Sequence, residues 1–248
     1  MRQSNGYIIL FTAIMTIVVG GLLSMASQVL GPKQKESIEL DTKTQILAAV
    51  MDLKKGDDVL AIYDQRISSL VVDINGEIIK TNAKGGALVA EEVNILKNYK
   101  KDPKNREYPV FKFINETDTS KVEAYIFPIY GNGLWDKIWG FVALQNDLQS
   151  IAGIALDHKA ETPGLGARIK DQEVRNRYVG KKIYNVAGEL VSVSMVKGEK
   201  GDPLDDHHID GMSGATLTGK GVNNMLLQYL TSYQGYLNKL KSTDTANL

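Results

Sequence analysis

The chain has 248 residues, enough for one sizeable domain with a membrane anchor or for two small domains. Lysine plus arginine and aspartate plus glutamate each number 29, so the formal net charge is zero, which argues against a nucleic-acid-binding protein with its basic excess. There is no cysteine, which excludes disulfides, thiolate catalysis and cysteine-ligated iron–sulfur clusters, so any electron transfer would need an organic cofactor or a metal held by other side chains.

The first predicted element is a membrane-spanning helix. Tyr7 to Leu30 form a run of 24 residues without a charge, and about 20 apolar residues suffice to cross the hydrocarbon core of a bilayer. We expect residues 1–32 to be an N-terminal transmembrane anchor in a lipid bilayer. The alternative is a cleaved signal peptide with a small-residue site at Ser24 to Ser27, but the apolar run is longer than is usual for one. The flanking positive charges do not decide the orientation.

Helices and one hairpin are predicted between the anchor and residue 100. The predicted helices are Leu40–Leu53, Asp57–Ile67 and Glu91–Lys100. The first of them has Asp41 or Thr42 as its expected N-cap. Asn75-Gly76 lies between the segment Val71-Val72-Asp73-Ile74 and the pair Ile78-Ile79, and predicts a tight hairpin turn.

Strands dominate from residue 108 onward. The predicted strands are Pro109–Ile114, Val122–Ile129, Ile138–Leu144, Ile151–Leu156 and Leu190–Val196. A last helix is predicted for Gly219–Leu240, where apolar residues recur at helical spacing and are expected to pack in the core. This order predicts an α+β fold, with one domain over residues 33–248 that has a mainly antiparallel sheet and flanking helices.

The segment from Asp210 to Thr218 reads DGMSGATLT and leads directly into the last helix. Its small residues let the backbone approach a ligand closely, and the first-turn N–H groups of a helix favour a phosphate. Thr216 and Thr218 offer hydroxyls, and Lys220 could add positive charge. The alternative is that Ser213 or Thr218 is merely the N-cap of the helix.

A second candidate segment, Glu161 to Gly166, reads ETPGLG. Pro163-Gly164 suits the central positions of a type II turn. Glu161 and Thr162 bring a carboxylate and a hydroxyl to this turn. Spacing alone leaves open that the segment is an ordinary surface turn.

Together these two segments resemble the FMN-binding domain family, in which the same motifs occur in this order. The segments Gly133–Trp135 and Trp139–Leu144 resemble, within it, the C subunits of Na⁺-translocating NADH:quinone reductases, and the anchor and length agree. The resemblance implies that FMN is joined by a phosphoester bond to Thr216, that Asp210 belongs to the sequence read by a separate flavin transferase, and that residues 161–166 lie against the flavin ring. The implied flavin-binding residues are Thr216, Ser213, Gly214, Ala215, Thr218, Glu161, Thr162, Pro163, Gly164, Leu165 and Gly166.

The resemblance also implies a function. The chain would be an electron-carrying subunit of a sodium-pumping NADH:quinone oxidoreductase, a single-pass protein of the bacterial inner membrane with a periplasmic domain. Its partners would be the other membrane subunits and, during maturation, the flavin transferase. Two alternatives remain open: the G subunit of the related Rnf electron-transport complex, and a non-redox membrane-anchored binding or assembly module with an unmodified Thr216.

Two further features have ordinary structural interpretations. Trp135 and Trp139 could stack near a flavin or lie at an interface, but burial in the core is the expectation. The acidic loop around His207 and His208 could hold a cation or dock a partner, and we expect it to be a solvated loop. No catalytic acid, base or metal ligand is predicted.

Overall fold

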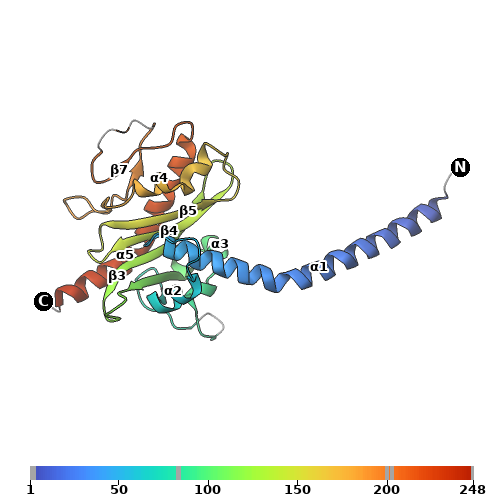
Figure 1. The fold of residues 1–248 in the computed structure, drawn as a ribbon, viewed down its shortest axis with the longest axis horizontal. Helices are drawn as coiled ribbons and strands as arrows, with labels where there is room; N and C mark the ends of the chain where they lie inside the picture. The colour runs from blue at the N-terminus through green and yellow to red at the C-terminus, as the bar shows by residue number, and fades with distance from the viewer. Residues whose placement is uncertain (1–3, 82–84, 199–200, 202–203, 247–248) are drawn as a thin grey trace. The chain divides into compact units, whose positions relative to one another are not determined.

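The computed structural model describes residues 4–81, 85–198, 201 and 204–246, and the chain divides into two units, Met1–Lys43 and Thr44–Leu248 (Figure 1). The first unit is a single helix, the larger part of α1 (Asn5–Ala48). By length and composition this helix could cross a membrane, and its apolar side chains between Tyr7 and Leu30 are exposed. These features fit the predicted anchor.

The predicted separate helix Leu40–Leu53 is wrong, because α1 continues through Pro32 and ends at Ala48. Neither predicted N-cap begins a helix, and the Thr42 hydroxyl instead donates to the carbonyl of Ile38, one turn back, at 2.8 Å. A proline removes one helical hydrogen bond but does not by itself separate two helices. The Glu39–Lys43 pair, 3.0 Å apart at i,i+4 spacing, adds support after the proline.

The second unit is built on one antiparallel sheet, as predicted. Its five strands are adjacent in chain order, and each pairs antiparallel with the next. They are β1 (Ile67–Val72), β2 (Tyr108–Ile114), β3 (Val122–Asn132), β4 (Lys137–Gln145) and β5 (Ile151–His158). The last four match predicted strands, and β1 extends the first arm of the predicted hairpin toward the N-terminus.

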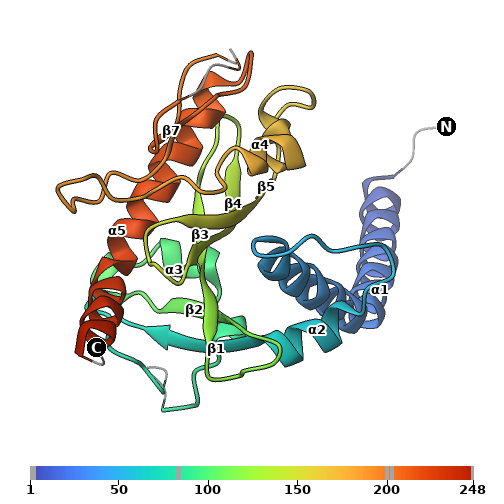
Figure 2. The ribbon, with the colours of Figure 1, turned by 60° about the vertical axis from the view of Figure 1, so that its left-hand side comes forward.

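Both faces of the sheet are covered, since side chains alternate between two hydrophobic clusters. Phe127 and Ile129 of β3 face the last helix, α5 (Thr216–Ala246), where the ring of Tyr233 lies 4.6 Å from that of Phe127. The neighbouring Ile126 faces the opposite way, toward the end of α1, where Ile46 is fully buried. Figure 2 shows α5 running along its face of the sheet. The predicted core stripe of α5 is confirmed, and the helix is longer at both ends than predicted.

The elements before β2 are shorter than predicted. Helix α2 (Val59–Arg66) has Asp58 as its N-cap. The hairpin turn is confirmed, because the Gly76 N–H donates to the Asp73 carbonyl at 3.0 Å and Gly76 has a φ of 78°. The predicted helix Glu91–Lys100 is two pieces, η1 (Ala90–Glu92) and α3 (Ile95–Tyr99), followed by η2 (Pro103–Asn105). It is interrupted because the Asn94 side chain starts α3 afresh by capping it.

A long connection with little regular structure leads from β5 to α5. It contains η3 (Gly166–Lys170), α4 (Gln172–Asn176) and the short parallel pair β6 (Ser194–Met195) and β7 (His208–Ile209). The predicted strand Leu190–Val196 is therefore reduced to two residues. Ser192, with a φ of 62°, breaks the extended backbone just before them.

Candidate functional site

The site begins at the first residue of α5. Thr216 is that residue and is exposed. The Gly219 N–H donates to the Ala215 carbonyl at 3.0 Å, which makes Ala215 the N-cap. Alanine has no side-chain acceptor for the first-turn N–H groups, so Ala215 itself provides no side-chain cap for this helix of 31 residues. The alternative that Ser213 or Thr218 is the N-cap is wrong.

The two motifs meet at this helix start. The Thr218 hydroxyl donates to Oε2 of Glu161 at 2.6 Å, across 57 positions of sequence. A Cβ built on Gly214 would lie 2.7 Å from Cδ2 of Leu165, so the loops also touch through a glycine that leaves no room for a side chain. The fold thus brings together both loops that the sequence singled out.

The ETPGLG segment forms the predicted turn. The Leu165 N–H donates to the Thr162 carbonyl at 3.1 Å, and Gly164 has a φ of 75°, as the third position of a type II turn requires. Thr162, Pro163 and Gly164 are exposed, whereas Glu161 and Gly166 are buried. The segment therefore presents its turn to solvent and its two ends to the protein.

Four exposed apolar side chains belong to the segments that meet at Thr216. They are Leu134, Trp135, Leu165 and Leu217. The expectation that Trp135 is buried is wrong, since 68% of its surface is exposed; it lies in the turn between β3 and β4, beyond the sheet. Trp139 is half-buried and packs against the core, as expected.

The turn that carries Trp135 is tied down by hydrogen bonds. The Gly133 N–H donates to the Asp136 carbonyl at 2.8 Å, and the Trp135 N–H donates to Oε1 of Glu161 at 2.9 Å. The Lys159 ammonium and the Lys137 backbone N–H both bond the Asp136 carboxylate, and these bonds lower its pKa.

Arg177 is a site residue that sequence reasoning missed. Its guanidinium donates to the carbonyls of Gly211 at 2.7 Å and Asp210 at 3.3 Å, and it pairs with Glu173 at 2.6 Å. From the C-terminal end of α4, it therefore holds the start of the DGMSGAT segment. No local pattern marks its role at the site, because the carbonyls that it binds lie 33 and 34 positions further along the chain.

The two histidines of the histidine loop bond separate partners. The His207 ring bonds the Lys182 carbonyl at 2.8 Å, and the His208 ring bonds Asp205 at 2.7 Å. The Asp205 pKa is lowered, first by the His207 backbone N–H and then by the His208 side chain. Among the residues that the structure describes, no group of three or more His, Cys, Asp or Glu could hold a metal ion.

The cavity beside Thr216 is small, about 70 Å³, and is lined in part by Met195, Gly211 and Lys220. Pockets for small ligands usually measure roughly 300–1,000 Å³. A cofactor as large as a flavin could not be enclosed here, although its phosphate could approach the helix start.

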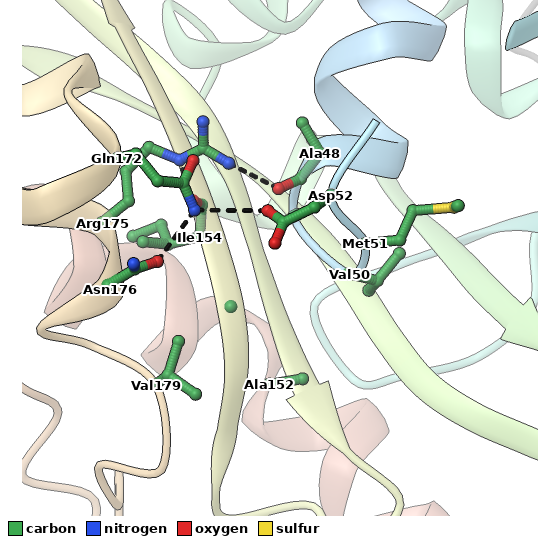
Figure 3. Close-up of a pocket in the computed structure, with 12 residues that line it drawn as sticks. Ala48, Val50, Met51, Asp52, Ala152, Ile154, Gln172, Arg175, Asn176 and Val179 are labelled. Carbon is green, nitrogen blue, oxygen red and sulfur yellow. Dashed lines mark hydrogen bonds between the residues drawn. The ribbon is translucent and has the colours of Figure 1, made fainter. Parts of the chain in front are cut away.

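Another cavity, of about 170 Å³, lies at the end of α1 beside β5 and α4 (Figure 3). Its polar groups bind one another: Arg175 donates to the carbonyls of Ala48 at 2.6 Å and Ile154 at 2.8 Å, and Gln172 donates to Asn176 at 2.8 Å. Burial lowers the pKa of Arg175, against the effect of the Asp52 carboxylate. None of the predicted site residues lines this cavity, and its bonds brace α4 against the end of α1.

The FMN-binding domain family matches residues 133–231, which contain both motifs. The C subunit of the Na⁺-translocating NADH-quinone reductase from Pseudomonas aeruginosa is 32% identical, over 91% of this chain and 91% of that relative. The C subunit of the same reductase from Neisseria meningitidis serogroup A is also 32% identical, over 96% of this chain and 95% of the relative.

Solved structures agree with the sequence relatives. The crystal structure of the reductase's C subunit from Parabacteroides distasonis has a TM-score of 0.71 and 31% identity, and covers 84% of this chain and 96% of that one. NqrC from Shewanella oneidensis has a TM-score of 0.68 and 26% identity, and covers 83% of this chain and 99% of that one. The chain therefore belongs to the family formed by the C subunits of Na⁺-translocating NADH-quinone reductases.

Proposed function

We propose that this chain carries electrons within a sodium-pumping NADH:quinone oxidoreductase, by means of an FMN joined through its phosphate to the hydroxyl of Thr216. The observation that carries the proposal is the exposed Thr216 hydroxyl at the start of α5, inside the matched FMN-binding region. When bound, FMN supplies reversible electron transfer, and the protein supplies position and electrostatic tuning.

The residues at the helix start suit a phosphodiester. Such a group keeps one negative charge, which the positive end of the helix dipole and the unpaired first-turn N–H groups stabilise. Ala215 and Lys220 line the cavity beside Thr216, and Lys220 adds a positive charge one turn later. None of the residues in the first turn of α5 is itself acidic, and the carboxylate that bonds this turn, Glu161, reaches it at Thr218.

The surrounding surface suits an aromatic ring that is not enclosed. Leu165, Leu217 and Trp135 offer exposed apolar area against which the flavin ring would pack. Because the cavity at Thr216 holds only about 70 Å³, non-covalent retention would be weak, and a covalent bond would keep the cofactor in place. An exposed ring edge would allow electrons to pass to cofactors in partner subunits.

The rest of the assignment concerns the chain's surroundings. Residues 1–32 would anchor it in the bacterial inner membrane, and residues 33–248 would form a periplasmic FMN-binding domain. The other reductase subunits would be its partners, and a flavin transferase would attach the FMN by reading the sequence from Asp210 to Thr216. Reporters fused after Leu248 test the orientation. If only a reporter that works in the cytoplasm is active, the domain is not periplasmic and the assignment is wrong.

Denaturing electrophoresis under ultraviolet light tests the covalent bond. Wild-type chain from a host with the transferase should give a fluorescent band, Thr216→Ala should give none, and the neighbouring Thr218→Ala should keep at least part of it. Fluorescence that survives in Thr216→Ala would move the attachment site. The subunits that co-purify with the chain distinguish a quinone reductase from an Rnf complex. A wild-type band without fluorescence would favour the non-redox alternative.

A further inference from the structure

We infer that Glu161 is a positioning residue whose buried carboxylate fixes the attachment turn of α5 against the β3–β4 turn and lowers the potential of the flavin. The inference rests on the proposed function, because it concerns the same site. It differs from the expectation that Glu161 contacts the flavin, since this side chain points into the protein.

The carboxylate is almost wholly enclosed and uses both oxygens. Glu161 is 4% exposed, and Thr218, which donates to Oε2 at 2.6 Å, is 1% exposed. Oε1 accepts the backbone N–H of Trp135 at 2.9 Å. One side chain thus joins three segments: the loop after β5, the turn after β3 and the first turn of α5.

Two glycines make room for this carboxylate. A Cβ on Gly166 would lie 2.5 Å from Oε2 of Glu161 and 2.5 Å from Oγ1 of Thr218, and a Cβ on Gly133 would collide with Oε1. Real Cβ atoms do not approach so closely, so any side chain at either position would displace the carboxylate. The enclosure also holds the carboxylate in one place. If it moved away from its donors, its oxygens would stay shielded from water and would have no hydrogen bond, which is unfavourable.

The position of this group relates it to the cofactor. Thr218 lies two residues after Thr216 in the same helical turn, so the bond to Glu161 restrains the residue that carries the phosphate. The carboxylate also places a negative charge beside the attachment turn. Reduction would add electron density to the flavin ring, and the charge of this enclosed, weakly hydrated carboxylate would oppose it. Glu161 therefore disfavours the reduced flavin.

Hydrogen exchange of the purified full-length chain tests the positioning role without needing flavin. Thr218→Val removes the donor and keeps the shape, and Thr218→Ser is its matched control because it keeps the hydroxyl. We expect Thr218→Val to raise exchange at the Trp135 amide, in the peptide over residues 133–136, by about fivefold or more, while Thr218→Ser exchanges like wild type. The peptide over β4 is the internal reference and should not change.

Potentiometric titration of the loaded chain tests the electrostatic role. Glu161→Gln is nearly isosteric and removes the charge, so its flavin midpoint potential should rise above that of wild type, while Thr216 remains loaded. Two exchange results would overturn the inference: unchanged exchange at residues 133–136 in Thr218→Val, or an equal rise in the β4 peptide. An unchanged flavin midpoint potential in Glu161→Gln would also overturn it. A wild-type chain without flavin would defeat the proposed function instead and would leave the exchange comparison valid.

Discussion

Two glycines in the first turns of α5 should respond in opposite ways to the same substitution. Alanine at either position gains about 0.8–1.0 kcal/mol of helix propensity. At Gly219 the added Cβ would meet Met195 Sδ at 3.4 Å and its Cβ at 3.7 Å, which are ordinary contacts. At Gly221 it would collide with the backbone carbonyl of Asn132 and lie 3.2 Å from the Cα of Gly133. The backbone at the end of β3 cannot move aside as a side-chain tip can.

The balance of helix propensity against overpacking decides whether each substitution stabilises the chain. Overpacking typically costs about 1–3 kcal/mol, so Gly221→Ala should be neutral to about 2 kcal/mol less stable than wild type. Gly219→Ala should be about 0.5–1 kcal/mol more stable, since nothing opposes its propensity gain. A domain of this size changes its Tm by roughly 2–4 °C per kcal/mol.

Thermal unfolding of the two variants, followed by circular dichroism, measures the difference directly. We expect Gly219→Ala to melt above wild type and Gly221→Ala to melt at or below it. Equal stabilisation of both variants would refute the reasoning, because it would mean that α5 does not pack closely against the end of β3. Flavin loading of Gly221→Ala should also fall, since the displaced helix carries Thr216.

Three further predictions concern other contacts, each measured by unfolding of the full-length chain. Arg175→Met should lose about 2–4 kcal/mol by leaving two carbonyls without a charged donor, and Arg175→Lys should lose less; equal stability of all three chains would contradict the brace at the end of α1. Tyr233→Phe should lose about 1–2 kcal/mol because the buried Pro109 carbonyl loses its 2.7 Å donor; no loss would show that the bond contributes nothing. Asp136→Asn should flatten the acid side of the stability curve: the Lys159 bond lowers the folded pKa of Asp136, so its stabilisation is present above the unfolded pKa of about 3.9 and is lost as pH falls through the folded value. An unchanged acid limb would contradict this.

Local sequence pattern predicted the sheet and the last helix well, for a physical reason. β2 to β5 are runs of apolar and β-branched residues bounded by polar turns, and α5 repeats its apolar residues at helical spacing. In both cases the pattern and the burial agree. The sequence did not predict that α1 continues through Pro32. A proline weakens a helix locally, but its presence does not show whether the flanking turns are stable enough for the helix to continue.

The site was predictable as two loops but not as an arrangement. The motifs identified Thr216 and the ETPGLG turn, and their order in the chain produced the family resemblance. The bond between Glu161 and Thr218, the carbonyl contacts of Arg177 and the exposure of Trp135 depend on how distant segments pack. Interactions across 34 to 57 positions leave no local signal.

Peptide mass spectrometry of the chain, purified from a host that has the flavin transferase, tests the central claim most directly. After proteolysis, the account predicts that the peptide containing Thr216 carries the mass of FMN less one water, and that fragmentation places the addition on Thr216 rather than on Ser213 or Thr218. An unmodified Thr216 in fully recovered peptide, or an addition on a neighbouring hydroxyl, would contradict the account.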